Sequence, residues 1–339
     1  NEELFITRLT SFVSRFLLGE VKRGVTDADV GFIFDLKRYV LEGRSVGLFP
    51  EGDIHFFGET LPIEKSLAKL AKMLGIPIVC LQVHGAHLRA PRCGNKAHRG
   101  KIVYEITDVI PQEMVKTSGM DALLNRMVAG IKVHENNYQR KVMTKMIGNR
   151  RAEWLELGLF LCPQCHDYET LKSEGNQLHC THCNLEIHVN SYGFLEQKKG
   201  DLSATDFKNY DDCSKWNAWQ LGELHRNVSM MNDNQTVFFA KDIDLQQTKV
   251  GHYFSLKSTP ISCELTRNTL QIFASQLQKI LTIPLVDLQD CLVQYKDVLE
   301  LIYAGNRYRI STKKRKWSAY LWAQTIQYLT TMNSPTKKI

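Results

Sequence analysis

The chain has 339 residues, of which 43% are hydrophobic and 23% are charged, and its formal net charge is +7. This length and composition allow one large core and a second core, so we expect a multidomain globular protein. The sequence contains no run of about 18 apolar residues, which excludes an apolar transmembrane helix, and it shows no signal peptide. We therefore expect a cytosolic chain.

Charge is unevenly distributed along the sequence. Residues 1–150 carry 22 basic and 16 acidic side chains, residues 201–339 carry 17 and 13, and residues 151–200 carry 4 and 7. Two basic clusters contain no acidic residue, and they lie at 89–101 and 307–316. Such clusters suit phosphates on a substrate, a membrane surface or a nucleic acid, but they also occur as solvated faces or turns.

The first half of the chain alternates between helical and strand patterns. Residues 3–18 form an amphipathic helical pattern that suits either core packing or a membrane interface. Further elements are expected as helices at 27–42, 64–74 and within 119–147, and as strands at 45–49, 78–83 and 101–107. This alternation predicts an α/β sheet layered with helices.

The stretch Gly47–Asp53, GLFPEGD, places a carboxylate behind a short apolar run. Proline ends a strand and glycine permits a tight turn, so Glu51 is expected at the carboxyl edge of the sheet, where open α/β folds bind ligands. The four residues Phe49–Gly52 would also suit an ordinary turn in which the glutamate faces water.

Three segments in order resemble the conserved blocks of glycerolipid acyltransferases of the lysophosphatidic acid type. Gly19–Gly24 resembles the second block, Phe49–Gly52 the third and Gly75–Val79 the fourth. The resemblance covers residues 1–150 and implies an acyltransferase-like sheet with helices. It implies transfer of a fatty acyl group from acyl-CoA or acyl carrier protein to the hydroxyl of a lysophospholipid, at the cytoplasmic face of a membrane.

The resemblance also implies which residues bind the acceptor. Lys22 and Arg23 would bind its phosphate, because an arginine fork matches phosphate in bidentate fashion. The other acceptor-binding residues would be Phe49, Pro50, Glu51 and Gly52, with the Glu51 carboxylate accepting hydrogen bonds from hydroxyl groups.

The catalytic base of this family is the histidine of a His-x-x-x-x-Asp motif, which this chain lacks. We expect the motif upstream of Asn1; the alternative is a non-catalytic lipid- or protein-binding protein on an acyltransferase-like scaffold. Asp53-Ile54-His55 also replaces the usual Thr-Arg-Ser, which removes a basic residue beside the acceptor site. His55 could replace the base, but it has no partner at a known spacing.

Cys162, Cys165, Cys180 and Cys183 form two Cys-x-x-Cys pairs. Four thiolates at this spacing suit a structural tetrahedral zinc ion in a zinc ribbon, whereas two disulfides would be unusual in the cytosol. The neighbouring histidines, His166, His179 and His182, are expected not to bind the metal. Because residues 151–200 are net acidic, we expect no nucleic-acid partner.

From about residue 234 onward, several short strand patterns are followed by a helical pattern at 317–329. The arrangement is similar to a pleckstrin-homology-like barrel closed by a helix. Its basic cluster could face lipid headgroups or be a solvated turn. The predicted domains are an acyltransferase-like domain at 1–150 with its start missing, a zinc ribbon at 151–200, a linker at 201–233 and the β domain at 234–332.

Overall fold

The computed structural model describes residues 30–233, 235–249, 252–255, 261–274, 279–312 and 317–333. Three sequence predictions therefore lie outside the described residues: the amphipathic helix at 3–18, the pair Lys22 and Arg23, and the basic residues 313–316.

The chain forms two compact units, and neither is continuous in sequence. The first comprises residues 1–52, 62–81 and 106–131, and the second comprises the rest of the chain. The predicted domain boundaries stay predictions, because this division follows contacts between segments that are distant in sequence.

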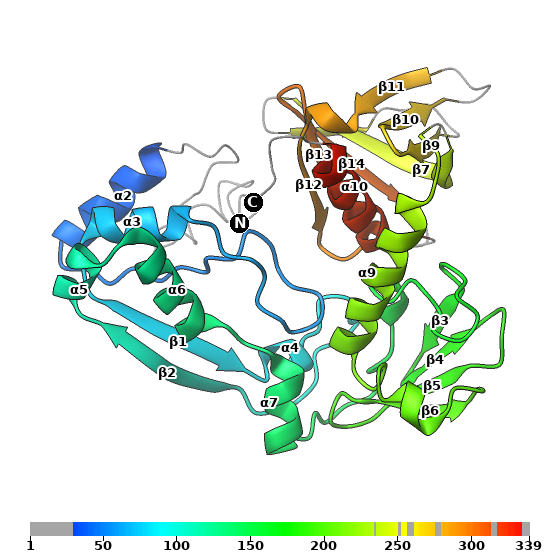
Figure 1. The fold of residues 1–339 in the computed structure, drawn as a ribbon, viewed down its shortest axis with the longest axis horizontal. Coiled ribbons are helices and arrows are strands. Elements are labelled where there is room, and N and C mark those ends of the chain that lie inside the picture. Colours follow the sequence, from blue (N-terminus) through cyan, green and yellow to red (C-terminus); the bar gives the residue numbers. More distant parts are fainter. Residues whose placement is uncertain are drawn as a thin grey trace. The chain divides into compact units, whose positions relative to one another are not determined.

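The described part of the first unit has a small helix-on-sheet core (Figure 1). Its elements are α2 (Val30–Leu41), α3 (Ser66–Leu74), much of β1 (Ile78–His84) and of β2 (Val103–Ile110), α5 (Gln112–Thr117) and α6 (Met120–Ile131). A Cβ atom on Gly130 would lie 2.7 Å from the Cβ of Cys80, so α6 packs directly on β1. Gly75 ends α3 in the left-handed conformation (φ 60°), which glycine adopts without a steric penalty.

The predicted strand at 45–49 is wrong. Residues 44–50 lie outside any helix or strand, and the side chain of Phe49 is 94% exposed. A strand needs a hydrogen-bonding neighbour, and the described strands of this part pair only as β1 with β2, which run in opposite directions (Figure 1). The mixed α/β class is confirmed, whereas an acyltransferase-like sheet stays a prediction.

The remaining early elements follow the sequence with small shifts. The strand at 78–83 and the helix at 64–74 are confirmed within one or two residues, and β2 begins slightly later than predicted. The long helical pattern within 119–147 is divided between α6 and α7 (Glu135–Val142). A short helix, α4 (Ala86–Arg89), follows β1.

The second unit contains a small four-stranded antiparallel sheet around the paired cysteines. Its strands are β3 (Leu171–Glu174), β4 (Gln177–Cys180), β5 (Glu186–Val189) and β6 (Leu195–Lys199), in that order, after the short 3-10 helix η2 (Leu155–Leu157). The segment expected as a linker instead contains α8 (Ala204–Phe207) and α9 (Cys213–Ser229). Ser203 and Asp212 cap these two helices with their side-chain oxygens, which explains where each begins.

The C-terminal part is an antiparallel β domain with one helix, as predicted. Its strands are β7 (Thr236–Lys249), β8 (His252–Ser255), β9 (Ile261–Thr266), β10 (Thr269–Phe273), β11 (Lys279–Pro284), β12 (Leu288–Gln294), β13 (Val298–Tyr303) and β14 (Asn306–Thr312). The 3-10 helix η4 (Leu285–Asp287) precedes β12, and α10 (Ala319–Asn333) ends the described chain.

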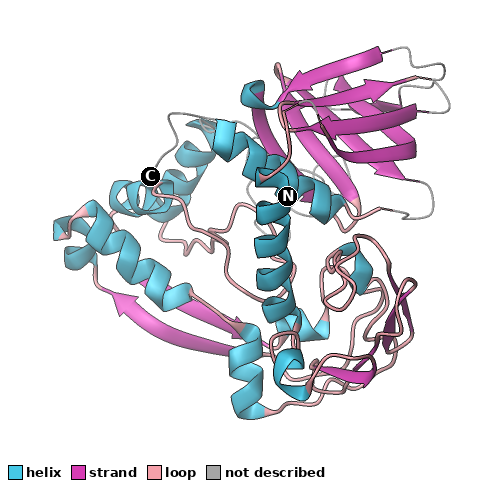
Figure 2. Ribbon diagram, turned by 45° about the vertical axis from the view of Figure 1, so that its right-hand side comes forward, coloured by secondary structure: helices cyan, strands magenta, loops and turns pink. Residues whose placement is uncertain are grey.

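These strands form one curved sheet (Figure 2) in the order β11-β10-β9-β7-β14-β13-β12, with β8 paired to β7. The first strand, β7, therefore pairs with β8 and β9, which follow it in the chain, and also with the last strand, β14. A bulge between Lys241 and Ile243, with Asp242 at a φ of 55°, interrupts its register. Helix α10 packs against β12 and β13.

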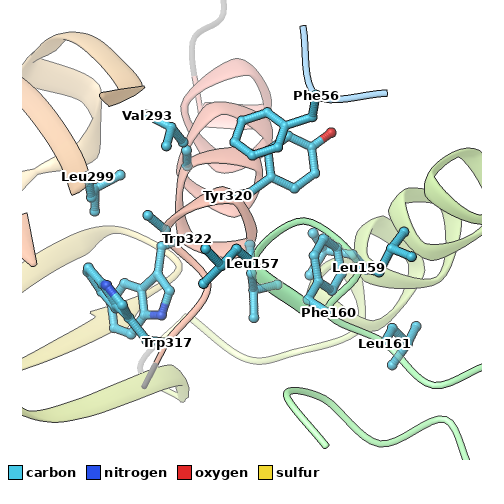
Figure 3. Packing of buried hydrophobic residues seen from close by; sticks show 14 of the residues in the cluster. Phe56, Leu157, Leu159, Phe160, Leu161, Val293, Leu299, Trp317, Tyr320 and Trp322 are labelled. Atoms are coloured by element: carbon cyan, nitrogen blue, oxygen red, sulfur yellow. The ribbon is translucent and has the colours of Figure 1, made fainter. Parts of the chain in front are cut away.

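Segments from distant parts of the sequence share one core in the second unit (Figure 3). The rings of Phe56 and Tyr320 lie 4.4 Å apart between centroids, and the Tyr320 hydroxyl lies 3.1 Å from Asn217 Oδ1. Trp317 and Trp322 pack together with ring centroids 5.0 Å apart. The residues that follow the Pro-Glu-Gly sequence are thus part of the core beneath the last helix.

Candidate metal centre and acceptor loop

The four paired cysteines lie together and could bind a metal ion such as zinc. Their sulfur atoms all lie within 4.8 Å of one another. The Sγ atoms of Cys162 and Cys183 are 3.7 Å apart, as are those of Cys165 and Cys180. A tetrahedral ion with metal–sulfur bonds of about 2.3 Å requires sulfur atoms about 3.8 Å apart, so the spacing fits zinc.

Two tight turns bring the sulfur atoms together. After Cys165, His166 has a φ of 58°, and its amide donates to the Cys162 carbonyl at 3.0 Å. The second pair begins at the end of β4, where the Cys180 amide donates to the Leu185 carbonyl at 3.0 Å. Both turns follow from local sequence, since each pair needs only two intervening residues.

The sulfur atoms differ in their environments. Burial raises the pKa of Cys180, but hydrogen bonds with the Thr170 hydroxyl and with the amides of His182 and Cys183 outweigh it and lower the pKa to about 7. Burial raises the pKa of Cys165 to about 11 and also raises the pKa of Cys162. A bound dication would favour the thiolate form of all four residues.

The neighbouring histidines have other partners. His182 Nδ1 lies 3.0 Å from Asp167 Oδ2, and this hydrogen bond lowers the pKa of the Asp167 carboxyl. The ring of His166 packs edge-on against Trp219, with centroids 5.4 Å apart. Among the described residues, the four cysteines are the group that could bind a metal. The four predicted cysteine ligands therefore lie together, and the group contains no histidine.

The proposed acceptor residues lie in an irregular loop. Phe49 is almost fully exposed, Pro50 and Glu51 are half-buried, and Gly52 is exposed. Lys22 and Arg23 are outside the described residues, so only residues 49–52 of the predicted acceptor-binding set are described, and their role stays a prediction.

The residue directly after this loop, Asp53, contacts a buried arginine, Arg92. The sequence indicates Arg92 only as part of a basic cluster. The Arg92 side chain is 6% exposed, and its Nη1 donates to Asp53 Oδ2 at 3.0 Å. Its Nε donates to the Tyr295 carbonyl at 2.9 Å, and its guanidinium lies 4.3 Å from the ring centroid of Phe56. Further hydrogen bonds reach the carbonyls of Ile54 and Val293. Arg92 therefore binds protein groups and is not available to a phosphate.

The second basic cluster is also partly neutralised. Arg309 Nε lies 2.6 Å from Glu300 Oε2, and Arg307 Nε lies 3.5 Å from Glu300 Oε1. Glu300 is 1% exposed, so two of the predicted lipid-facing cations pair with a buried carboxylate.

His55 is the residue that could have replaced the missing base. Its Nδ1 accepts a hydrogen bond from the Gly58 amide at 3.1 Å, and its ring packs edge-on against His87, with centroids 5.3 Å apart. Desolvation, with repulsion by His55, lowers the pKa of His87 to about 3. One ring nitrogen of His55 is thus already occupied by the backbone, and a neutral histidine lies beside it.

Two other histidines, not singled out by the sequence analysis, approach carboxylates. His134 Nε2 lies 3.0 Å from Glu59 Oε1, and His84 Nε2 lies 3.6 Å from Glu105 Oε2. His84 is 5% exposed and stacks on Tyr138 at 3.8 Å between centroids. Burial lowers its pKa, so His84 acts as a neutral packed ring.

No protein-family model matches the chain, and no curated protein matches it. Among solved structures, the chain is similar to the N-terminal PH domain of human ARAP2, with 12% identity and a TM-score of 0.24 over 30% of this chain and 86% of that one. The C-terminal PH domain of human FGD3 gives 15% identity and a TM-score of 0.20 over 31% and 96%.

A structure of the Vav1 exchange factor with its PH and C1 domains gives 14% identity and a TM-score of 0.23 over 40% of this chain and 42% of that one. The solved structures named here all contain PH domains. At these TM-scores the likeness carries no argument about function, and the β domain is defined here by its own strand order and closing helix.

Proposed function

We propose that the chain is a membrane-surface acyltransferase that transfers a fatty acyl group from acyl-CoA or acyl carrier protein to a lysophospholipid hydroxyl. The observation that carries the proposal is the loop at 48–52, where a phenylalanine that is 94% exposed precedes a half-buried glutamate. An exposed aromatic ring beside a carboxylate suits an acceptor that is part hydrocarbon and part polyol. The order of the blocks resembling the acyltransferase family supports the same activity.

In this proposal the residues of the chain position the acceptor. Arg23 would bind its phosphate and Glu51 would accept hydrogen bonds from its hydroxyl groups. The attacking hydroxyl oxygen forms a bond to the thioester carbonyl carbon, and the carbon–sulfur bond breaks. The hydroxyl proton passes through a general base, which none of the residues named here supplies, to the leaving thiolate.

The four cysteines would hold a structural zinc ion. A closed set of four thiolates leaves no position for a substrate, so the ion would stabilise the small sheet of β3 to β6. Its contribution would be to folding, because so small a sheet has little core of its own.

Membrane association would be peripheral. None of the described helices has the length and apolar character needed to cross a bilayer. We propose that the chain works at the cytoplasmic face, where its lysophospholipid acceptor would be found.

The alternative is a non-catalytic lipid- or protein-binding protein on an acyltransferase-like scaffold. Two observations favour it: the sequence has no His-x-x-x-x-Asp motif, and residues 45–49 do not form the predicted strand. In that case the exposed loop would bind a lipid or a protein without reaction.

An acyl-transfer assay separates the two functions. The protein expressed from its complete reading frame would be incubated with radiolabelled acyl-CoA or acyl carrier protein and a panel of lysophospholipids. Formation of a labelled diacyl product that depends on acceptor supports the transferase. Absence of product with every donor and acceptor, while lysophospholipid still binds, supports the alternative.

A further inference from the structure

Two basic segments that lack acidic residues lie side by side in the second unit. Residues 86–104 and 136–152 each contain five lysine or arginine residues and no aspartate or glutamate. An antiparallel bridge joins them: the Arg99 amide donates to the Ile147 carbonyl at 2.8 Å, and the Ile147 amide donates to the Arg99 carbonyl at 2.7 Å. The fold therefore concentrates positive charge from two parts of the sequence.

The inner face of this pair is buried. Met146 is 1% exposed, and a Cβ atom on Gly100 would collide with its sulfur. His98 is 5% exposed, and a Cβ atom on Gly148 would lie 2.8 Å from its Nδ1. Paired extended segments alternate between two faces, so the residues between these positions lie on the opposite face.

The outer face consists of Arg99, Lys101, Lys145 and Ile147, and all four are exposed. Among the residues that the structure describes, none of the three cations forms an ion pair, although Lys145 Nζ lies 5.9 Å from the ring centroid of Tyr192. The Ile147 side chain is 67% exposed. Met143, a few residues earlier, is 47% exposed.

We propose that this outer face binds the surface of an anionic membrane. The three cations would contact headgroup phosphates, and the isolated aliphatic side chain of Ile147 would enter the interface between headgroups and acyl chains. Sequence-independent binding of a single-stranded nucleic acid would instead use exposed aromatic rings for base stacking, and the outward side chain here is aliphatic. The inference deepens the proposed membrane association, but its residues lie outside the acceptor loop, so vesicle binding and acyl transfer can fail separately.

Vesicle co-sedimentation tests the proposal without any acyl-transfer assay. The full chain would be mixed with phosphatidylcholine vesicles, with or without phosphatidylserine, and the bound fraction measured. A triple variant, Arg99→Gln with Lys101→Gln and Lys145→Gln, should bind the anionic vesicles on the order of 100-fold more weakly. Each cation near such a surface contributes about fivefold to the affinity.

A matched control removes the same charge elsewhere. Glutamine at Lys172, Lys208 and Lys241 gives an equal change in net charge and should leave binding within about threefold, because local and not total charge governs contact with a membrane. Tryptophan fluorescence would confirm that both triple variants are folded.

Ile147→Asn tests the apolar contact. It should weaken the binding that persists at high salt, where exposed charges are screened. Three results would overturn the proposal: equal binding to uncharged vesicles, equal loss in both triple variants, or tighter binding to single-stranded RNA than to anionic vesicles.

Discussion

Replacing Arg92 by methionine should destabilise the second unit. Methionine keeps much of the aliphatic length but removes every donor, so the carbonyls of Ile54, Val293 and Tyr295 lose their partner. Asp53 contributes less, because its side chain is 37% exposed and water can replace the guanidinium. Water can also reach the carbonyls of Ile54 and Tyr295, whose hydrogen bonds are exposed, whereas the Val293 carbonyl is partly buried. With about 1–3 kcal/mol for a buried acceptor left unpaired, we expect a loss of about 1–3 kcal/mol in the free energy of unfolding.

Denaturant unfolding followed by tryptophan fluorescence measures this loss. All five tryptophans belong to the second unit, namely Trp154, Trp216, Trp219, Trp317 and Trp322. The free energy of unfolding of Arg92→Lys should lie between those of the natural protein and Arg92→Met, because an ammonium group retains the charge but cannot form the same fork of hydrogen bonds. Arg89→Met is the matched control, since Arg89 is exposed.

The result that refutes this reasoning is a small difference between the two methionine variants. If Arg92→Met unfolds within about 0.5 kcal/mol of Arg89→Met, the effect of an ordinary surface substitution, then the buried guanidinium does not join these segments.

Three further predictions follow from local geometry. Cys165→Ser should release zinc, measured by metal analysis, and expose the module to protease, and stoichiometric metal in that variant would exclude the four-sulfur site. Burial raises the pKa of Glu135, so its ionisation makes the native state less stable as pH rises above about 4.5. Glu135→Gln should therefore be more stable than the natural protein at pH 7 and should lose that advantage in acid. An advantage that does not depend on pH would contradict this. Gly130→Ala should lower the free energy of unfolding by about 1–3 kcal/mol, because the added Cβ atom would collide with Cys80. Gly222→Ala, in open space within α9, should raise it by up to about 1 kcal/mol. Circular dichroism melts that show equal effects would contradict both.

The metal ligands could be predicted from sequence because the signal is local. Each cysteine pair is fixed by two intervening residues, and chain reversal at β3 and β4 brings the pairs together. The β domain could be predicted for a similar reason, since most of its strands pair with a neighbour in sequence, although the pairing of the first strand, β7, with the last, β14, could not.

Elements that depend on distant partners could not be predicted in this way. The apolar run at 45–49 has the composition of a strand, but its conformation depends on a neighbouring strand that the run itself does not specify. Arg92 was assigned to a basic cluster because its partners are residues 53–54 and 293–295, far away in the sequence. For Arg307 and Arg309 the sequence leaves open whether they face lipid headgroups or a solvated turn. The structure pairs both with Glu300 on the adjacent strand, where Glu300 lies directly opposite Arg309.

The acceptor role of Glu51 tests the account most directly. Acyl transfer would be measured with the complete protein at increasing lysophospholipid concentration, for Glu51→Gln and for the control Glu64→Gln, which changes an exposed glutamate. We predict that Glu51→Gln lowers kcat/KM for the acceptor by about 10- to 100-fold, the effect of losing hydrogen bonds to a charged group, while Glu64→Gln leaves it unchanged. Equal kcat/KM values for the two variants would contradict the proposed acceptor site.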